Sequence, residues 1–270
     1  MKTKQLFILF VFSMLLIACA SAENSTDSSS QDSPIVLVHG AWQDGSSWVQ
    51  VQQELEANGH TVSAVTLPGR DGEDAGAQTL EGYRDAVIAE VESYDEPVIL
   101  VGHSFGGMTI SAVAEAIPDQ IASLVYLAAY LPSDGDSLLT LSEEDHISVL
   151  GEEGNLNFSE DSAVASVTPE KFAELFCPDC SDASIEAVTA SAVGEPAAPL
   201  AQPISLTDEN FGAVSKAYIL TSQDIVVGTQ LQVMMLANTP VDQIFVLDTG
   251  HAPYVTAAAE IAGLLDQLQQ

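Results

Sequence analysis

The sequence predicts an α/β fold: a mainly parallel sheet of about six strands with helices on both faces and an inserted helical cap. Short apolar runs rich in β-branched residues recur along the chain, and segments with helix-like spacing separate them. With 270 residues, 47% of them hydrophobic, the chain is long enough for one domain with a sizeable core.

The first strand is predicted at residues 34–38, an apolar run that ends at His39-Gly40. Further strands are predicted at residues 61–65, 97–101, 122–129, 216–221 and 243–247, with helical spacing near 48–57, 82–92 and 104–116. Strands that alternate with helices form a parallel sheet covered on both faces.

The alternation stops between about residues 133 and 210, where Asp, Glu, Ser and Ala dominate. An unstructured loop of that length is improbable inside a compact domain. We therefore expect an inserted, mostly helical cap there, within a domain that covers residues 34–270.

The first residues have the pattern of a bacterial export signal. Lys2 and Lys4 precede the apolar run 6–18, which is too short to span a bilayer with margin. The tetrad 16–19 (Leu-Ile-Ala-Cys) resembles a lipobox, so we predict a signal peptide at 1–18 and a lipid on Cys19. The mature chain would then be anchored at the outer face of a membrane or in the periplasm.

Ordinary cleavage after Ala20-Ser21-Ala22 is the alternative, and it would release a soluble secreted protein. In either case, residues 19–33 are polar and without apolar periodicity, as in a flexible tether.

The net charge is strongly negative. The chain has 39 acidic and 6 basic residues, hence −33, or about −35 without Lys2 and Lys4. Such a charge argues against nucleic acid as a partner. Because the chain repels itself and salt screens the repulsion, a saline habitat would suit it, and we expect salt to stabilise its fold.

Two cysteines remain besides Cys19. Cys177 and Cys180 enclose Pro178-Asp179 and could close a small disulfide loop in an oxidising compartment. A thioredoxin-like motif would open a helix after a strand, and zinc would need further ligands nearby. Neither pattern is present, so we interpret this pair as structural and predict no metal site.

A nucleophile motif follows the third predicted strand. Residues 102–106 (Gly-His-Ser-Phe-Gly) fit Gly-x-Ser-x-Gly, with a strand before them and a helical pattern after them. Gly102 and Gly106 would allow the strand and helix to approach closely around a strained turn. Ser104 is therefore the predicted nucleophile.

A serine hydroxyl needs a base, and His251 lies just past the last predicted strand, at the same sheet edge as Ser104. The other histidines precede or adjoin the serine or lie in the predicted cap: His39, His60, His103 and His146.

The base needs a carboxylate, and the chain order Ser, acid, His places it between residues 104 and 251. Asp224 follows the strand 216–221 by a short turn and is the preferred candidate. Asp248 lies three residues before His251 and is the rival. In so acidic a chain, either could be an ordinary surface carboxylate.

Oxyanion stabilisation requires two backbone N–H groups, one after the nucleophile and one from the loop after the first strand. Phe105 and Ala41 occupy these positions, and Gly40 would let the backbone turn beneath the substrate carbonyl. Trp42 and Trp48 could form pocket walls.

Together these residues resemble the plant methylesterase and hydroxynitrile lyase branch of the α/β-hydrolases and its bacterial relatives. The similarity runs from Pro34 nearly to the C-terminus. Its specific matches are residues 36–42, 101–108 and 124–132, Tyr218-Ile219 with Asp224, and Gly250-His251 with Pro253. The resemblance implies the α/β-hydrolase fold, an ester hydrolase with a small cap over an apolar pocket, and Asp224 as the acid.

Cyanohydrin-cleaving members of that branch carry a threonine after the loop histidine and a lysine after the catalytic histidine. This chain has Gly40 and Ala252 at those positions. Without an ammonium group to stabilise cyanide, the resemblance favours hydrolysis over lyase chemistry.

The resulting hypothesis is a hydrolase of small or medium carboxylic esters, lactones included, that acts through an acyl-enzyme on Ser104 without metal or cofactor. One alternative is a non-catalytic protein that binds a small apolar ligand. Perhydrolysis or carbon–carbon bond hydrolysis on the same fold is another.

Overall fold

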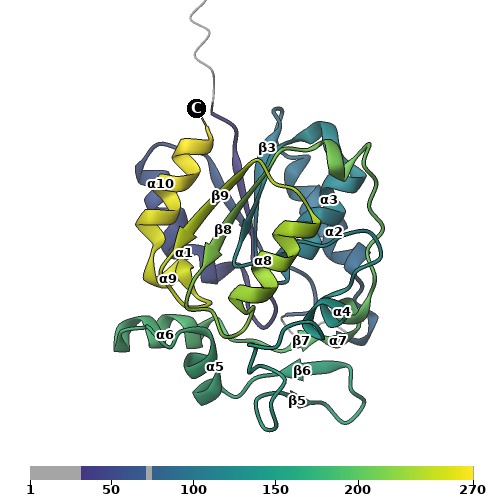
Figure 1. The fold of residues 1–270 in the computed structure, drawn as a ribbon. Helices are drawn as coiled ribbons and strands as arrows, with labels where there is room; N and C mark the ends of the chain where they lie inside the picture. The colour runs from purple at the N-terminus through teal and green to yellow at the C-terminus, as the bar shows by residue number, and fades with distance from the viewer. Residues whose placement is uncertain (1–31, 71–74, 270) are drawn as a thin grey trace, which may run out of the picture. The chain divides into compact units, whose positions relative to one another are not determined.

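The computed structural model describes residues 32–70 and 75–269. Six parallel strands form its main sheet, in the order β2-β1-β3-β4-β8-β9. They are β1 (Ile35–Val38), β2 (Val62–Val65), β3 (Val98–His103), β4 (Ile121–Leu127), β8 (Lys216–Thr221) and β9 (Gln243–Leu247). Figure 1 labels β3, β8 and β9 of this sheet. The predicted fold class and strand positions are confirmed.

Helices cover both faces of this sheet. α1 and α10 pack together on one side, and α2 and α3 on the other (Figure 1). The helices outside the segment between β4 and β8 are α1 (Val49–Ala57), α2 (Leu80–Val91), α3 (Gly106–Ala116), α8 (Thr229–Asn238), α9 (Pro253–Thr256) and α10 (Ala258–Leu268). Short 3-10 helices occur at η1 (Gly45–Trp48), η2 (Ala75–Ala77), η3 (Pro118–Gln120) and η4 (Phe211–Ala213).

Burial explains the composition of the strands. Every residue of β1, β3 and β8 is buried, as expected for parallel strands covered on both faces. The edge strand β9 is more open and exposes Ile244 and Val246. The carboxyl ends of the buried strands β1, β3 and β8 lead to Ala41, Ser104 and Asp224, whereas His251 follows the edge strand β9.

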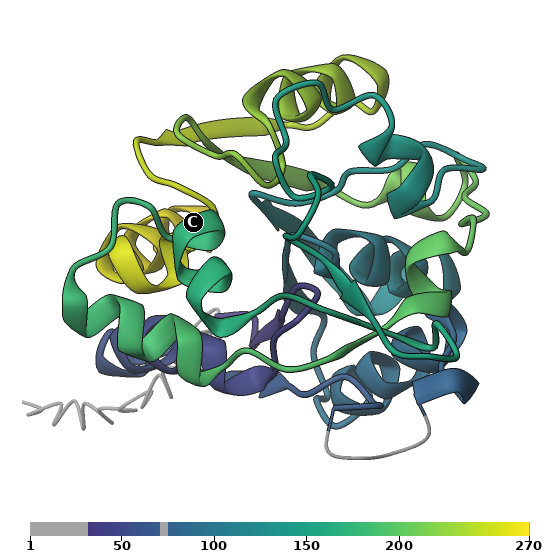
Figure 2. The ribbon, with the colours of Figure 1, turned by 90° about the horizontal axis from the view of Figure 1, so that it is seen from below.

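The segment between β4 and β8 lies at the carboxyl edge of the sheet (Figure 1), and Figure 2 looks onto it from that side. We call this segment the cap. It contains α4 (Leu138–Ser142), β5 (Asn157–Phe158), β6 (Val164–Ser166), α5 (Pro169–Phe176), α6 (Asp182–Ala190), β7 (Glu195–Pro196) and α7 (Ala197–Ala201).

The cap contains the helices expected from the sequence, together with a small sheet that was not expected. Its helices are joined by irregular stretches, and β5, β6 and β7 form a small antiparallel sheet. These strands are only two or three residues long. That is too short for the alternation by which strands are recognised in a sequence.

The predicted signal peptide 1–18, Cys19 and the predicted tether up to residue 31 lie outside the described residues. Within the described ranges, every helix is too short or too polar to cross a bilayer.

A buried histidine ties the ends of β1 and β2 together. Nδ1 of His39 donates to the carbonyl of Gly40 at 2.8 Å, and Nε2 accepts from the Leu67 N–H at 3.0 Å. Burial, reinforced by the positive charge of Arg70, lowers the pKa of His39 from 6.5 to about 3. The neutral imidazole thus anchors the start of the loop after β1.

We expect His39 to make the fold sensitive to mild acid. An unfolded chain protonates this residue below pH 6.5, whereas the folded chain resists until about pH 3. Stability therefore falls as the pH drops through this window, by up to about 1.4 kcal/mol per pH unit. His39→Gln keeps one donor and one acceptor but does not titrate, so its melting temperature should fall less between pH 6.5 and 5.

Calorimetry at fixed ionic strength measures this difference above the range in which most carboxylates titrate. Parallel curves for the wild type and His39→Gln would rule out the proposed linkage. His103 is also buried, and its pKa is lowered mainly by burial and to a lesser extent by His251. The His39→Gln variant should therefore keep part of the dependence of melting temperature on pH.

Candidate active site

Ser104 occupies a strained turn between β3 and α3. Its φ is 51°, in the left-handed region that side chains other than glycine rarely adopt. A Cβ at Gly102 would lie 2.7 Å from the Gly106 carbonyl oxygen, and one at Gly106 would lie 2.7 Å from that of Val38. The two glycines thus permit the close packing that holds Ser104 at the carboxyl edge of the sheet.

His251 follows β9 and is fully buried. Its Nδ1 lies 2.8 Å from Oδ2 of Asp224, which follows β8. When Nδ1–H donates to this carboxylate, the Nε2 lone pair is left free to accept a proton. The structure therefore brings together the predicted base and its preferred acid.

The Asp224 carboxylate is held by further donors. Oδ2 accepts from Thr221 Oγ1 at 3.0 Å, and Oδ1 accepts from the N–H groups of Val226 and Val227 at 2.8 and 2.9 Å. With both oxygens engaged, the carboxylate has one orientation, and it directs one oxygen to His251.

The rival Asp248 has a different environment. Its Oδ1 accepts from Ser222 Oγ at 2.6 Å and from Gln223 Nε2 at 2.9 Å. These two hydrogen bonds lower the pKa of the exposed Asp248 carboxyl. Asp248 thus stabilises the surface turns after β8 and β9, and Asp224 is the carboxylate that contacts His251.

The imidazole of His251 lies beside the residue that precedes Ser104. The rings of His103 and His251 are 4.7 Å apart, and Nε2 of His103 donates to the His251 carbonyl at 2.8 Å. Within the described ranges, Nε2 of His251 is buried and has no hydrogen-bond partner, Ser104 included. The hydrogen bond between a nucleophile and its base is often long or poorly aligned before substrate binds.

The predicted oxyanion donors lie on either side of this turn. A Cβ at Gly40 would lie 2.7 Å from the Ser104 Cβ, so the loop after β1 passes directly against the predicted nucleophile. Phe105 precedes the first residue of α3, where backbone N–H groups have no helical partner. Neither the Phe105 nor the Ala41 N–H donates to another backbone group in the part of the chain that is described.

The cap also contacts His251. The Phe176 ring makes an edge contact with the imidazole at 5.1 Å and with Trp42 at 6.1 Å. α5 ends at Phe176, and Cys177 directly after it is joined to Cys180 in a disulfide.

The turn inside this disulfide contacts the loop of the histidine. Asp179, between the two cysteines, accepts the Gly250 N–H at 3.1 Å. The cap is therefore hydrogen-bonded to the loop after β9, next to His251.

A cavity of about 380 Å³ adjoins the site. Trp42 and Tyr130 form part of its wall, and the Tyr130 N–H donates to the Ser104 carbonyl at 3.1 Å. The remaining wall is mostly apolar and comes from the cap, with Leu138, Leu150 and Leu200 among its residues. Trp48, in contrast, is fully buried and lines none of it.

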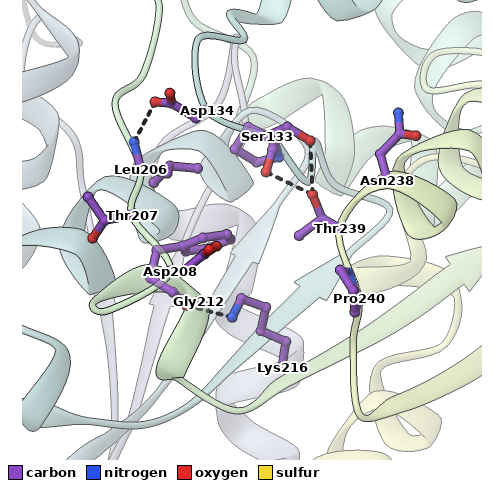
Figure 3. A pocket seen from close by; sticks show the side chains of 12 residues that line it. Ser133, Asp134, Leu206, Thr207, Asp208, Gly212, Lys216, Asn238, Thr239 and Pro240 are labelled. Atoms are coloured by element: carbon purple, nitrogen blue, oxygen red, sulfur yellow. Dashed lines mark hydrogen bonds between the residues drawn. The ribbon is translucent and has the colours of Figure 1, made fainter.

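Another pocket, of about 340 Å³, lies where β8 begins and contains none of the predicted site residues (Figure 3). There the Lys216 ammonium donates to the carbonyls of Phe211 and Val214 at 2.6 and 2.7 Å. Burial lowers the pKa of Lys216. Asp224 follows the opposite end of β8, so this pocket is separate from the cavity that adjoins the predicted site.

The sequence analysis did not identify Arg70 and Glu195, which form a buried ion pair next to the site. The only sequence feature that could have pointed to this pair is that Arg70 is one of six basic residues in a strongly acidic chain. Among the described residues, no three His, Cys, Asp or Glu side chains are grouped as metal ligands.

Known proteins are similar over most of the chain. Residues 35–264 match the Alpha/beta hydrolase family. Methylesterase 8 of Arabidopsis thaliana is 27% identical over 252 residues, which cover 91% of each chain. Salicylic acid-binding protein 2 of Nicotiana tabacum is 30% identical over 224 residues, which cover 77% of this chain and 85% of that protein.

Among solved structures, a pyrethroid hydrolase from Sphingobium faniae JZ-2 superimposes with a TM-score of 0.79 at 24% identity. The match covers 88% of this chain and 97% of that one. The predicted resemblance to plant methylesterases and bacterial relatives is thus confirmed. From its sequence and its fold, the chain belongs to the alpha/beta hydrolase family.

Proposed function

We propose that this protein hydrolyses small or medium carboxylic esters through an acyl-enzyme on Ser104. The observation that carries the proposal is the buried Asp224–His251 hydrogen bond at 2.8 Å, beside a serine in a strained strand-to-helix turn. A packing role alone would not require a buried carboxylate, an imidazole with a free nitrogen and a strained serine at one sheet edge.

The proposed reaction has two halves. His251 Nε2 takes the Ser104 proton as Oγ attacks the ester carbonyl, and the N–H groups of Ala41 and Phe105 stabilise the oxyanion. Collapse of this intermediate breaks the ester C–O bond, and His251 returns the proton to the leaving alcohol. Water then attacks the acyl-enzyme in the same way, which releases the acid and restores Ser104.

The substrate class is supported by the relatives and by the cavity. One relative is named a methylesterase and a structural neighbour a pyrethroid hydrolase. The apolar cavity beside Trp42 and Tyr130 suits an apolar acid or alcohol group of limited size.

Hydrolysis is favoured over cyanohydrin cleavage by two positions. The Cβ of a threonine in place of Gly40 would lie 2.7 Å from the Ser104 Cβ, so one of them would have to shift. Ala252 offers no ammonium group for leaving cyanide.

We further propose that the protein is exported and held at a membrane by a lipid on Cys19. The basis is the Leu-Ile-Ala-Cys tetrad at residues 16–19. Cells fed an alkyne fatty acid should label the wild type, whereas Cys19→Ser should lose the label and appear in the soluble fraction. Equal labelling of both proteins would contradict the anchor, and an unlabelled soluble wild type would favour cleavage after Ala22.

Ser104→Ala should abolish labelling by a fluorophosphonate probe and lower p-nitrophenyl acetate turnover at least about 10³-fold, because the nucleophile is lost. Ser93→Ala is the control, since Ser93 is exposed and, among the described residues, its hydroxyl bonds only to the Glu90 carbonyl. Intact-mass spectrometry measures the adduct. Turnover that persists in Ser104→Ala would exclude the acyl-enzyme, and an inactive wild type that binds apolar ligands tightly would favour a binding protein.

Asp224→Asn should lower kcat on the order of 10³-fold or more, because an amide cannot stabilise the imidazolium and favours the wrong tautomer. Asp248→Asn is the matched change at the neighbouring turn, and its kcat should stay within about twofold of the wild type. Steady-state kinetics on one ester decides between them. A large loss in Asp248→Asn alone would transfer the acid role to Asp248.

A further inference from the structure

A buried ion pair joins the cap to the core of the domain. Arg70 Nη2 lies 2.7 Å from Glu195 Oε2, and the exposed fractions of the two side chains are 1% and 0%. Glu195 begins β7 in the cap, whereas Arg70 follows β2 in the main sheet. The pair thus connects two parts of the chain that are distant in sequence.

Both partners also bond to the backbone of the loop after β1. Glu195 Oε2 accepts the Trp42 N–H at 3.0 Å, and Arg70 Nε donates to the Gln43 carbonyl at 3.0 Å. The carbonyl of Trp42 accepts the Val193 N–H of the cap at 2.9 Å. Successive backbone groups directly after Ala41 are therefore held by the cap and by Arg70.

Tyr83 completes the cluster from α2. Its hydroxyl donates to Glu195 Oε1 at 2.9 Å and accepts from Arg70 Nη1 at 2.8 Å. Burial raises the pKa of the Glu195 carboxyl, and the Arg70 charge opposes that rise. Each carboxylate oxygen has a donor, so a single arrangement of the cluster satisfies its charges.

The cluster acts on a strained part of the loop. Trp42 has a φ of 61°, which an aromatic residue adopts only when its surroundings impose it. The bond from the Trp42 N–H to Glu195 fixes the plane of the peptide that links Ala41 to Trp42. The preceding peptide carries the Ala41 N–H, the proposed oxyanion donor.

We propose that Glu195 is a positioning residue: its carboxylate holds the Trp42 N–H so that the Ala41 N–H points at the oxyanion, and Arg70 keeps that carboxylate in place. This inference rests on the proposed function. The oxyanion site is then complete only when the cap is seated. Both halves of the reaction pass through an oxyanion, so misplacement of Ala41 should slow both and lower kcat while KM changes little.

A purely structural role makes a different prediction. Buried ion pairs can often be replaced by apolar residues with little loss of stability, whereas removal of one partner leaves an unpaired charge. The informative comparison is therefore between two neutral double variants, Arg70→Met/Glu195→Gln and Arg70→Met/Glu195→Leu. Only the glutamine can still accept the Trp42 N–H.

We expect kcat for p-nitrophenyl acetate to be roughly 10- to 100-fold lower in the leucine double variant than in the glutamine one, with KM within about twofold. Hydrogen exchange of the segment 40–43 should be faster in the leucine variant. Thermal melting checks that both fold. Glu115→Gln is a control, because Glu115 ties the 207–211 segment to α3 away from the site, so it should lower stability but leave kcat unchanged.

Equal kcat values and equal exchange in the two double variants would overturn the positioning role and leave the ion pair as a structural link. A wild type without turnover would contradict the proposed function instead. In that case the exchange of segment 40–43 still decides whether Glu195 holds the loop, and unchanged protection in the leucine variant would overturn it.

Discussion

The hydrogen bond between Asp224 and His251 is the interaction on which the proposed chemistry depends. It joins the loops that follow two adjacent strands, β8 and β9, whose parallel register brings their carboxyl ends together. Burial excludes competing water, and the Val226 and Val227 N–H groups donate to Oδ1, the carboxylate oxygen that does not face His251. The imidazole therefore keeps one tautomer and turns its free nitrogen away from the acid.

The cap does more than cover this arrangement. Phe176 packs on the imidazole, Asp179 binds the Gly250 N–H, and Glu195 binds the Trp42 N–H. Phe176 and Asp179 come from the end of α5 and the turn after it, and Glu195 comes from β7. Together they contact the loops that follow β1 and β9. A change in the cap would thus affect the chemistry as well as the choice of substrate.

The sequence predicted what depends on local pattern. Buried parallel strands have a distinct composition, and the glycines at 102 and 106 mark the turn that holds Ser104. Asp224 and Asp248 both follow strands. Which of the two contacts His251 depends on the direction of their side chains, and tertiary packing sets that direction.

The cap sheet and the Arg70–Glu195 pair were missed for a physical reason. Very short strands carry no periodic signal. An ion pair between residues 125 positions apart creates no local sequence pattern, so only the scarcity of basic residues pointed to Arg70.

The few basic residues of the chain have unequal roles. Of the six, Lys2 and Lys4 lie outside the described residues, and Arg70 and Lys216 are buried. The remaining two, Arg84 and Lys171, pair with neighbouring carboxylates. Across the described residues, the outer surface therefore has almost no uncompensated positive charge. Ester hydrolysis turns a neutral molecule into an anion, so the electrostatic field around this protein would leave an arriving ester unaffected and drive the departing acid away.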